Sequence, residues 1–164
     1  MSTMTNRTRL GRKTTMAAGV GVAALAAAGA LAAPAQAAPV QVAQIPATAF
    51  SVSGLVVPGL EFVGVYADQT APGTVEMSAP ARPQMCSASA AGALVELGYL
   101  NLSTGKAGGT TVKPCPNYMG PTPVKAPIHP GAGQIAMTIR VIPSGLSPRA
   151  GQPSLPGAAT FTVR

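Results

Sequence analysis

The stretch ALVELGYLNLSTGKAGGTTV, from Ala93 to Val112, decides the fold of this chain. Apolar residues stand at every second position up to Tyr99, which is the period of a strand with one buried face. The glycine-rich segment Thr104–Gly109 follows, and Thr110–Val112 then returns to β-branched residues. An extended segment, a glycine-rich turn and a second extended segment predict a β-hairpin, because glycine adopts the positive φ of tight turns at no steric cost.

A phosphate-binding loop is the alternative interpretation of this turn. Such a loop needs a helix after it and a lysine just before Ser or Thr. Here Lys106 lies in the middle of the turn, and Pro114 blocks a following helix. We therefore interpret the turn as structural. Asn101-Leu102-Ser103 also matches the N-glycosylation triplet, but its position in a strand disfavours modification.

The period of two recurs on both sides of the hairpin. Further strands are predicted at 50–57, 60–66, 74–78, 134–142 and 158–163. The segment Ala88–Ala93 is too short, and interrupted by glycine, so it is at best a turn. About seven short strands with long Pro/Gly-rich loops predict an all-β protein with a single Ig-like antiparallel β-sandwich. A small β-barrel is the alternative.

The first 37 residues have the three parts of a secretory signal peptide. Basic residues come first, an alanine-rich apolar run from Met16 to Ala33 follows, and Pro34-Ala35-Gln36-Ala37 ends the leader with small residues at a peptidase site. We expect cleavage after Ala37, an extended segment over 38–48 and the β-sandwich domain over 49–164. No transmembrane segment is expected after cleavage. The product is expected to be secreted, extracellular or associated with the cell envelope.

The style of this leader and the alanine bias of the chain resemble the small exported Ig-like β-sandwich proteins of actinobacteria. The resemblance covers no diagnostic motif and implies no activity.

Cys86 and Cys115 are the only cysteines in the chain. An even number of cysteines in an exported protein predicts a disulfide. The bond would close a loop of about 29 residues, worth roughly 3.6 kcal/mol in the chain-entropy model. A metal pair or a catalytic thiol is the alternative, but neither cysteine belongs to a C-x-x-C motif.

The charge of the processed chain argues against nucleic-acid binding. Without the leader, 7 basic residues stand against 4 acidic ones, a balance of +3. A nucleic-acid site needs a basic patch with interleaved aromatic residues, whereas these basic residues are scattered singly along the chain.

Acid–base groups are few. The processed chain offers His129 and four carboxylates: Glu61, Asp68, Glu76 and Glu96. It contains no G-x-S-x-G, H-E-x-x-H or S-x-x-K motif. We expect Glu61 and Glu96 to be solvated charges on strand faces and His129 to be an exposed loop residue. The residue types present would allow a catalytic triad of Asp68, His129 and a serine, but we predict that the protein is not an enzyme and has no cofactor.

The stretch from Pro114 to Gly133 is the longest segment predicted to be irregular, and it contains six prolines. Long irregular segments in compact domains are often functional, and restricting their backbone lowers the entropy lost on binding. The candidate binding residues in this loop are Tyr118, Met119, Lys125 and His129.

A Cu(I) site from Met85, Met119 and His129 is the sharpest metal hypothesis, because thioether sulfur is a ligand for Cu(I). The chain has no M-x-x-M cluster after the leader and no second histidine. Methionine as core filler is therefore the preferred interpretation, and we predict no metal.

These observations predict a secreted or envelope-associated, non-catalytic interaction or structural module, whose partner is an envelope component or another protein. An extracytoplasmic binder of a small ligand, lipid or copper, is the alternative, and a hydrolase is a distant third. A closed apolar cavity would favour the binder, and a well-packed core with polar loops would favour the interaction module.

Overall fold

The computed structural model of the chain describes residues 37–52, 58–87 and 92–164. The predicted leader lies outside these residues, apart from Ala37, and so do residues 88–91 of the predicted turn. The described residues belong to the compact unit Pro34–Arg164.

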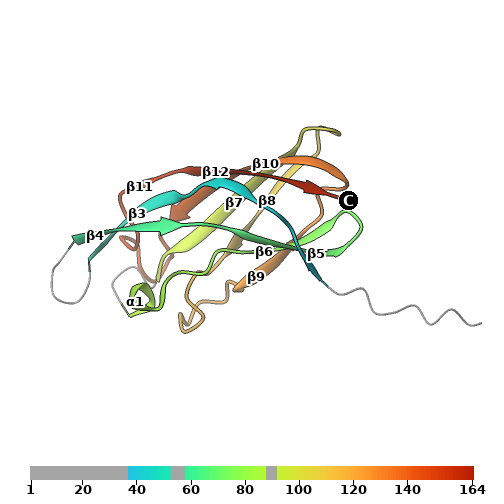
Figure 1. The fold of residues 1–164 in the computed structure, drawn as a ribbon. Helices are drawn as coiled ribbons and strands as arrows, with labels where there is room; N and C mark the ends of the chain where they lie inside the picture. The colour runs from blue at the N-terminus through green and yellow to red at the C-terminus, as the bar shows by residue number, and fades with distance from the viewer. Residues whose placement is uncertain (1–36, 53–57, 88–91) are drawn as a thin grey trace, which may run out of the picture. The chain divides into compact units, whose positions relative to one another are not determined.

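Strands make up most of the described residues, and all pairings between these strands are antiparallel (Figure 1). In chain order they are β1 (Ala38–Pro39), β2 (Ala43–Ile45), β3 (Ala47–Val52), β4 (Pro58–Val63), β5 (Tyr66–Ala71), β6 (Thr74–Ser78), β7 (Leu94–Asn101), β8 (Ala107–Val112), β9 (Lys125–Ile128), β10 (Gly133–Ile142), β11 (Ser154–Leu155) and β12 (Gly157–Val163). The α-helix among the described residues, α1 (Pro83–Cys86), is one turn long. The predicted all-β class is confirmed.

The strands form three sheets and do not close into a barrel. Sheet A has the order β1-β5-β6-β9, sheet B the order β2-β12-β10-β7-β8, and sheet C the order β11-β3-β4. Only Gly64 and Val65 separate β4 from β5, so sheets C and A follow one another along one layer, with sheet B as the opposite layer (Figure 1). The predicted antiparallel sandwich is confirmed, and the described residues exclude the barrel alternative.

The hydrophobic core lies between these two layers. Sheet B contributes Val95, Leu97, Val112, Ile135, Met137, Ile139, Val141, Ala159, Phe161 and Val163. The opposite layer contributes Ala47, Ala49, Val63, Val65, Ala67, Val75, Met77, Ala126 and Ile128. Every second residue of β12 is buried, as the pleat of a strand with one face on the core requires. The prediction that methionine fills the core is confirmed for Met77 and Met137 and is wrong for Met119, whose side chain is 93% exposed.

Residues 38–48, predicted as an extended segment ahead of the sandwich, belong to the sheets. β1 pairs with β5, β2 pairs with β12, and β3 begins at Ala47. At the joint between β4 and β5, Gln44 Oε1 accepts a hydrogen bond from the Val65 amide (2.8 Å), and Gln44 Nε2 donates one to the Val65 carbonyl (3.2 Å). The Gln44 side chain thus makes the two hydrogen bonds to the Val65 backbone that a neighbouring strand would make.

The hairpin predicted from the opening stretch is confirmed. β7 and β8 pair from Val95 opposite Val112 to Leu100 opposite Ala107. Gly105 in the turn has a φ of 75°, a conformation that favours glycine. Ala107, Gly108 and Gly109, predicted in the turn, lie in β8 instead.

Asn101 ends β7, and its fully buried side chain ties the hairpin turn to the segment between β9 and β10. Nδ2 donates to the carbonyls of Pro130 (3.0 Å) and Ala132 (2.9 Å). Oδ1 accepts from the amides of Ser103 (2.9 Å) and Thr104 (3.2 Å). Both amide hydrogens are therefore used inside the fold, which agrees with the prediction that this triplet is a poor glycosylation site.

The prediction that Pro114–Gly133 is one irregular segment is wrong in one respect, because this segment contains β9. β9 pairs with β6 and forms an edge of sheet A, a position that tolerates Pro127 because one side of an edge strand needs no ladder bonds. The irregular part between β8 and β9 is therefore residues 113–124. With the short pairings of β1, β2 and β11, the described residues form twelve strands, where about seven were predicted.

Candidate functional site

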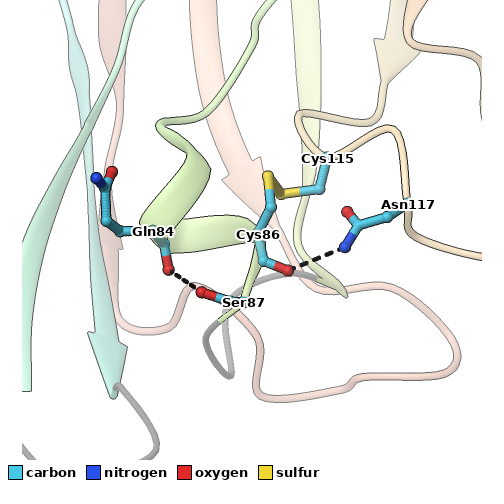
Figure 2. The surroundings of a disulfide bond; sticks show 5 residues. All are labelled: Gln84, Cys86, Ser87, Cys115 and Asn117. Carbon is cyan, nitrogen blue, oxygen red and sulfur yellow. Dashed lines mark hydrogen bonds between the residues drawn. A yellow bond between two sulfur atoms is a disulfide. The ribbon is translucent and has the colours of Figure 1, made fainter.

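The predicted disulfide between Cys86 and Cys115 is confirmed, with a Cα–Cα distance of 5.3 Å. It joins the last residue of α1 to the start of the irregular segment after β8 (Figure 2). Two hydrogen bonds support the α1 side of this link: Asn117 Nδ2 donates to the Cys86 carbonyl (3.2 Å), and Ser87 Oγ donates to the Gln84 carbonyl (2.9 Å).

The segment 113–124, which we call the strap, is held in place along its length. Lys113 Nζ donates to the carbonyls of Tyr118 (2.9 Å) and Gly120 (3.4 Å), so one ammonium group links the first residue of the strap to the backbone in its middle. The Lys113 amide donates to the Pro123 carbonyl (2.8 Å), which closes the strap on itself.

Tyr118 fastens the middle of the strap to a second loop. Its hydroxyl hydrogen-bonds to Ser144 Oγ at the start of the turn 144–151. A methyl group on Gly120 would meet the Tyr118 ring, so the absence of a side chain there lets the ring pack against the backbone. The strap is thus an ordered element with no regular secondary structure.

Met119 and Leu146 protrude from this ordered frame. The Met119 side chain is 93% exposed, although both of its neighbours in sequence are only partly exposed. Leu146 is also exposed, in the turn that Tyr118 reaches through Ser144. The strap and the turn 144–151 therefore present two apolar side chains from a fixed backbone.

The other two candidate binding residues of the strap region lie elsewhere. Lys125 is on β9, where Nζ is 3.2 Å from Glu76 Oε2 and 3.6 Å from Asp68 Oδ2. The hydrogen bond to Glu76 and the charge of that carboxylate raise the pKa of Lys125. His129 is exposed after the end of β9, with Nδ1 3.2 Å from Thr74 Oγ1.

The four candidates therefore separate: Tyr118 and Met119 belong to the strap, whereas Lys125 and His129 belong to the surface of sheet A. Sequence proximity suggested one site, but β9 carries the chain away from the strap. The turn 144–151, which the sequence did not single out, contributes to the strap instead.

The three residues of the Cu(I) hypothesis are not brought together. His129 lies beside Thr74, at the start of β6, whereas Met85 is on α1, beyond the other end of β6 (Figure 1). Met119 projects from the strap. Within the described residues there is also no group of three or more His, Cys, Asp or Glu side chains that could hold a metal ion.

Glu61 differs from the prediction, because its side chain is buried instead of solvated. It lies on the inward face of β4 beside a cavity of about 20 Å³, which Met85, Ala81 and Val95 also line. Burial raises the pKa of Glu61 above its ordinary value of 4.5, while a hydrogen bond from the Arg82 backbone and the Arg82 charge act in the opposite direction. The sequence did contain a signal, since Glu61 shares its parity in the strand with the buried Val63 and Val65.

Glu96 fits the prediction of a surface charge. Its carboxylate is 3.2 Å from the Arg140 guanidinium on the neighbouring strand β10, opposite it in the ladder.

The chain matches no protein-family model, and neither the curated proteins nor the solved structures contain a match to it. Within the described ranges, no helix has the length and hydrophobicity that crossing a bilayer requires.

Proposed function

We propose that this protein is an exported, envelope-associated and non-catalytic interaction module that binds its partner through the strap. The observation that carries the proposal is the 93% exposure of Met119 on a backbone fixed by a disulfide, the Lys113 ammonium group and Tyr118. The partner is an envelope component or another protein.

A fixed loop with protruding apolar side chains suits recognition. Little backbone entropy is lost on binding when the loop is already ordered. Methionine adapts its unbranched side chain to irregular partner surfaces, which is why it is common at such contacts. Leu146 extends the apolar contact from the neighbouring turn.

A non-catalytic role is supported by the use that the fold makes of its few acid–base groups. Asp68 and Glu76 both face Lys125, and Glu96 faces Arg140. These three carboxylates therefore form ion pairs on the surfaces of sheets A and B. Glu76 and Glu96 have their basic partners on the adjacent strand, where such pairs stabilise strand pairing modestly, whereas β6 lies between Asp68 on β5 and Lys125 on β9.

Export is supported by the leader pattern of the first 37 residues and by the disulfide. A disulfide is compatible with an oxidising compartment outside the cytoplasm, where such bonds form and persist.

The test is binding to isolated cell envelopes of the producing organism. Met119→Asp and Leu146→Asp place a charge where an apolar contact is proposed, and we expect each to weaken binding at least tenfold with unchanged circular dichroism. Leu102→Asp is the matched control, because Leu102 is an exposed leucine in the hairpin turn, away from the strap. Equal binding by the strap variants and the control would contradict the proposal.

A further inference from the structure

The sulfur atoms of the processed chain form a small set. Without the leader, the chain has two cysteines and four methionines, all of which lie among the described residues: Met77, Met85, Met119 and Met137. Cys86 and Cys115 are joined in the disulfide, and no free cysteine lies in the described ranges. Because a thiol is the side chain that oxidants usually attack first, an oxidant that meets this protein is left with the thioethers of methionine.

The fold shields the methionines to different extents. Met77 on β6 is 0% exposed and Met137 on β10 is 3% exposed, because both lie in the core between the layers. Met85 on α1 is half-buried and lines the cavity of about 20 Å³ beside Glu61. Met119 is 93% exposed. Its thioether is therefore the most accessible sulfur of the processed chain.

The strap holds Met119 in this exposed position. Lys113 Nζ donates to the carbonyls of Tyr118 and Gly120, the residues on either side of Met119. The Tyr118 hydroxyl is hydrogen-bonded to Ser144 Oγ in the next loop. Since the backbone is fixed on both sides of Met119, its exposure is a property of the ordered strap.

We infer that Met119 is an oxidation site, and that hydrogen peroxide weakens the binding of the strap to its partner by converting this thioether to the sulfoxide. The inference rests on the proposed function and adds a regulation of the same site. In the reaction, the sulfur attacks one peroxide oxygen, the O–O bond breaks and an S–O bond forms. The sulfur loses two electrons, and the second oxygen takes up the proton of the transferred oxygen and leaves as water.

The sulfoxide changes the chemistry of the proposed contact and leaves its frame intact. Oxidation converts the flexible, apolar side chain of methionine into a polar, chiral one. Burying the sulfoxide oxygen against a partner costs free energy unless the partner supplies a hydrogen-bond donor. Leu146, the other protruding side chain, contains no sulfur and stays apolar. Oxidation of Met119 therefore removes one of the two proposed apolar contacts.

The first test measures where the folded, processed chain is oxidised, independently of any partner. The chain is treated with dilute hydrogen peroxide, and peptide mass spectrometry follows the gain of one oxygen atom at each methionine. Met119 should react at least about tenfold faster than Met77 and Met137, with Met85 between them. In the urea-unfolded chain all four should react at similar rates. Equal rates at Met119 and Met77 in the folded chain, or a faster reaction at Met85, would overturn the inference.

The second test measures binding to isolated cell envelopes after oxidation. Catalase removes the peroxide before the protein meets the envelopes, so that only the protein is oxidised. The oxidised chain should bind at least about tenfold more weakly, with unchanged circular dichroism. Met119→Leu keeps an apolar side chain without sulfur, and its binding should stay within about threefold of the unaltered chain, both before and after peroxide.

Met85→Leu is the matched control, because it removes a half-buried sulfur outside the strap. Peroxide should weaken the binding of Met85→Leu as much as that of the unaltered chain. If peroxide weakens Met119→Leu as much as the unaltered chain, oxidation acts at another residue and the inference is wrong.

The regulation and the proposed binding surface fail in different ways. If Met119→Asp weakens envelope binding and the Met119 sulfoxide does not, the regulation is wrong and the strap remains the binding surface. If neither Met119→Asp nor Leu146→Asp weakens binding, the strap is not the binding surface. The regulation is then wrong as well, even where mass spectrometry finds selective oxidation at Met119.

Discussion

Replacing Asn101 by alanine should destabilise the fold by roughly 3–5 kcal/mol, although the change removes only an amide group. The Asn101 side chain is fully buried and makes four hydrogen bonds to backbone groups of two segments. The bond to the Pro130 carbonyl is buried, so losing its partner costs about 1–3 kcal/mol. The other three backbone groups are part-buried, where water can replace the side chain at a cost of about 0.5–1 kcal/mol each.

The assay is urea unfolding followed by circular dichroism. The expected loss corresponds to a fall in melting temperature of about 10–20 °C for a domain of this size. Asn117→Ala is the control, because Asn117 makes a single exposed hydrogen bond to the Cys86 carbonyl, and its loss should cost less than about 1 kcal/mol. If Asn101→Ala and Asn117→Ala have the same free energy of unfolding, the reasoning is refuted.

Asn101→Asp separates the lost donors from the lost volume. The aspartate keeps an acceptor for the amides of Ser103 and Thr104, but it places a carboxylate against the carbonyl oxygens of Pro130 and Ala132. We expect a destabilisation at pH 7 at least as large as for alanine. Because burial and the two carbonyls favour the protonated acid, the deficit of Asn101→Asp should shrink as the pH falls and should not shrink for Asn101→Ala.

Three further predictions concern the disulfide, the buried carboxyl group of Glu61, and the close contact of Gly157 with the backbone between β2 and β3. Replacing Cys86 and Cys115 together by serine should lower the free energy of unfolding by roughly 2–4 kcal/mol, and thiol labelling of the unreduced, denatured protein should detect no free thiol. Glu61→Gln should stabilise the protein at pH 7. Because the pKa of Glu61 is raised in the folded state, the unaltered protein loses stability as the pH rises from 4.5 through that folded-state pKa. Glutamine does not ionise, so the variant lacks this loss. A difference between Glu61→Gln and the unaltered chain that stays constant from pH 4 to 8 would contradict this, and Glu96→Gln, on an exposed pair, is the control. Gly157→Ala should cost at least ~2 kcal/mol, because a methyl group there would overlap the backbone of Ile45 and Ala47, whereas Gly145→Ala, with open space around it, should be neutral in the same unfolding assay.

The sequence predicted the parts of the fold whose signal is local. β7, β10 and β12 each alternate strictly over several residues, and a strand with one buried face must show that alternation. The hairpin followed from the glycines between two such segments, and the disulfide followed from the count of cysteines and the leader. None of these inferences needed a distant part of the chain.

The missed features depend on partners far away in sequence. β1 and β2 are only two and three residues long and exposed, and they are strands because β5 and β12 pair with them. β9 contains Pro127, which usually argues against a strand, but only one edge of β9 is paired.

The candidate site was predicted only in part, because some of its contacts also join residues that are far apart in sequence. Tyr118 and Met119 could be assigned to one loop because Cys115 is only a few residues away. Ser144 and Leu146 could not be assigned to it, because the contact between Tyr118 and Ser144 spans 26 residues of chain. The separation of Lys125 and His129 from the strap follows from the pairing of β9 with β6, which the sequence does not reveal.

The acidic residues and the exposed apolar side chains are distributed differently over this sandwich. The chain has four acidic residues, and three of them pair with basic residues on the surfaces of sheets A and B. The fourth, Glu61, is buried under sheet C. Large exposed apolar side chains lie on all three sheets, with Tyr66 on sheet A, Ile45 and Leu100 on sheet B and Leu60, Phe62 and Leu155 on sheet C, and also at the strap with the turn 144–151. The strap with the turn 144–151 differs from the other exposed apolar positions because its backbone is held by the disulfide, by the Lys113 ammonium group and by the Tyr118 hydroxyl, which is why we place the proposed binding surface there.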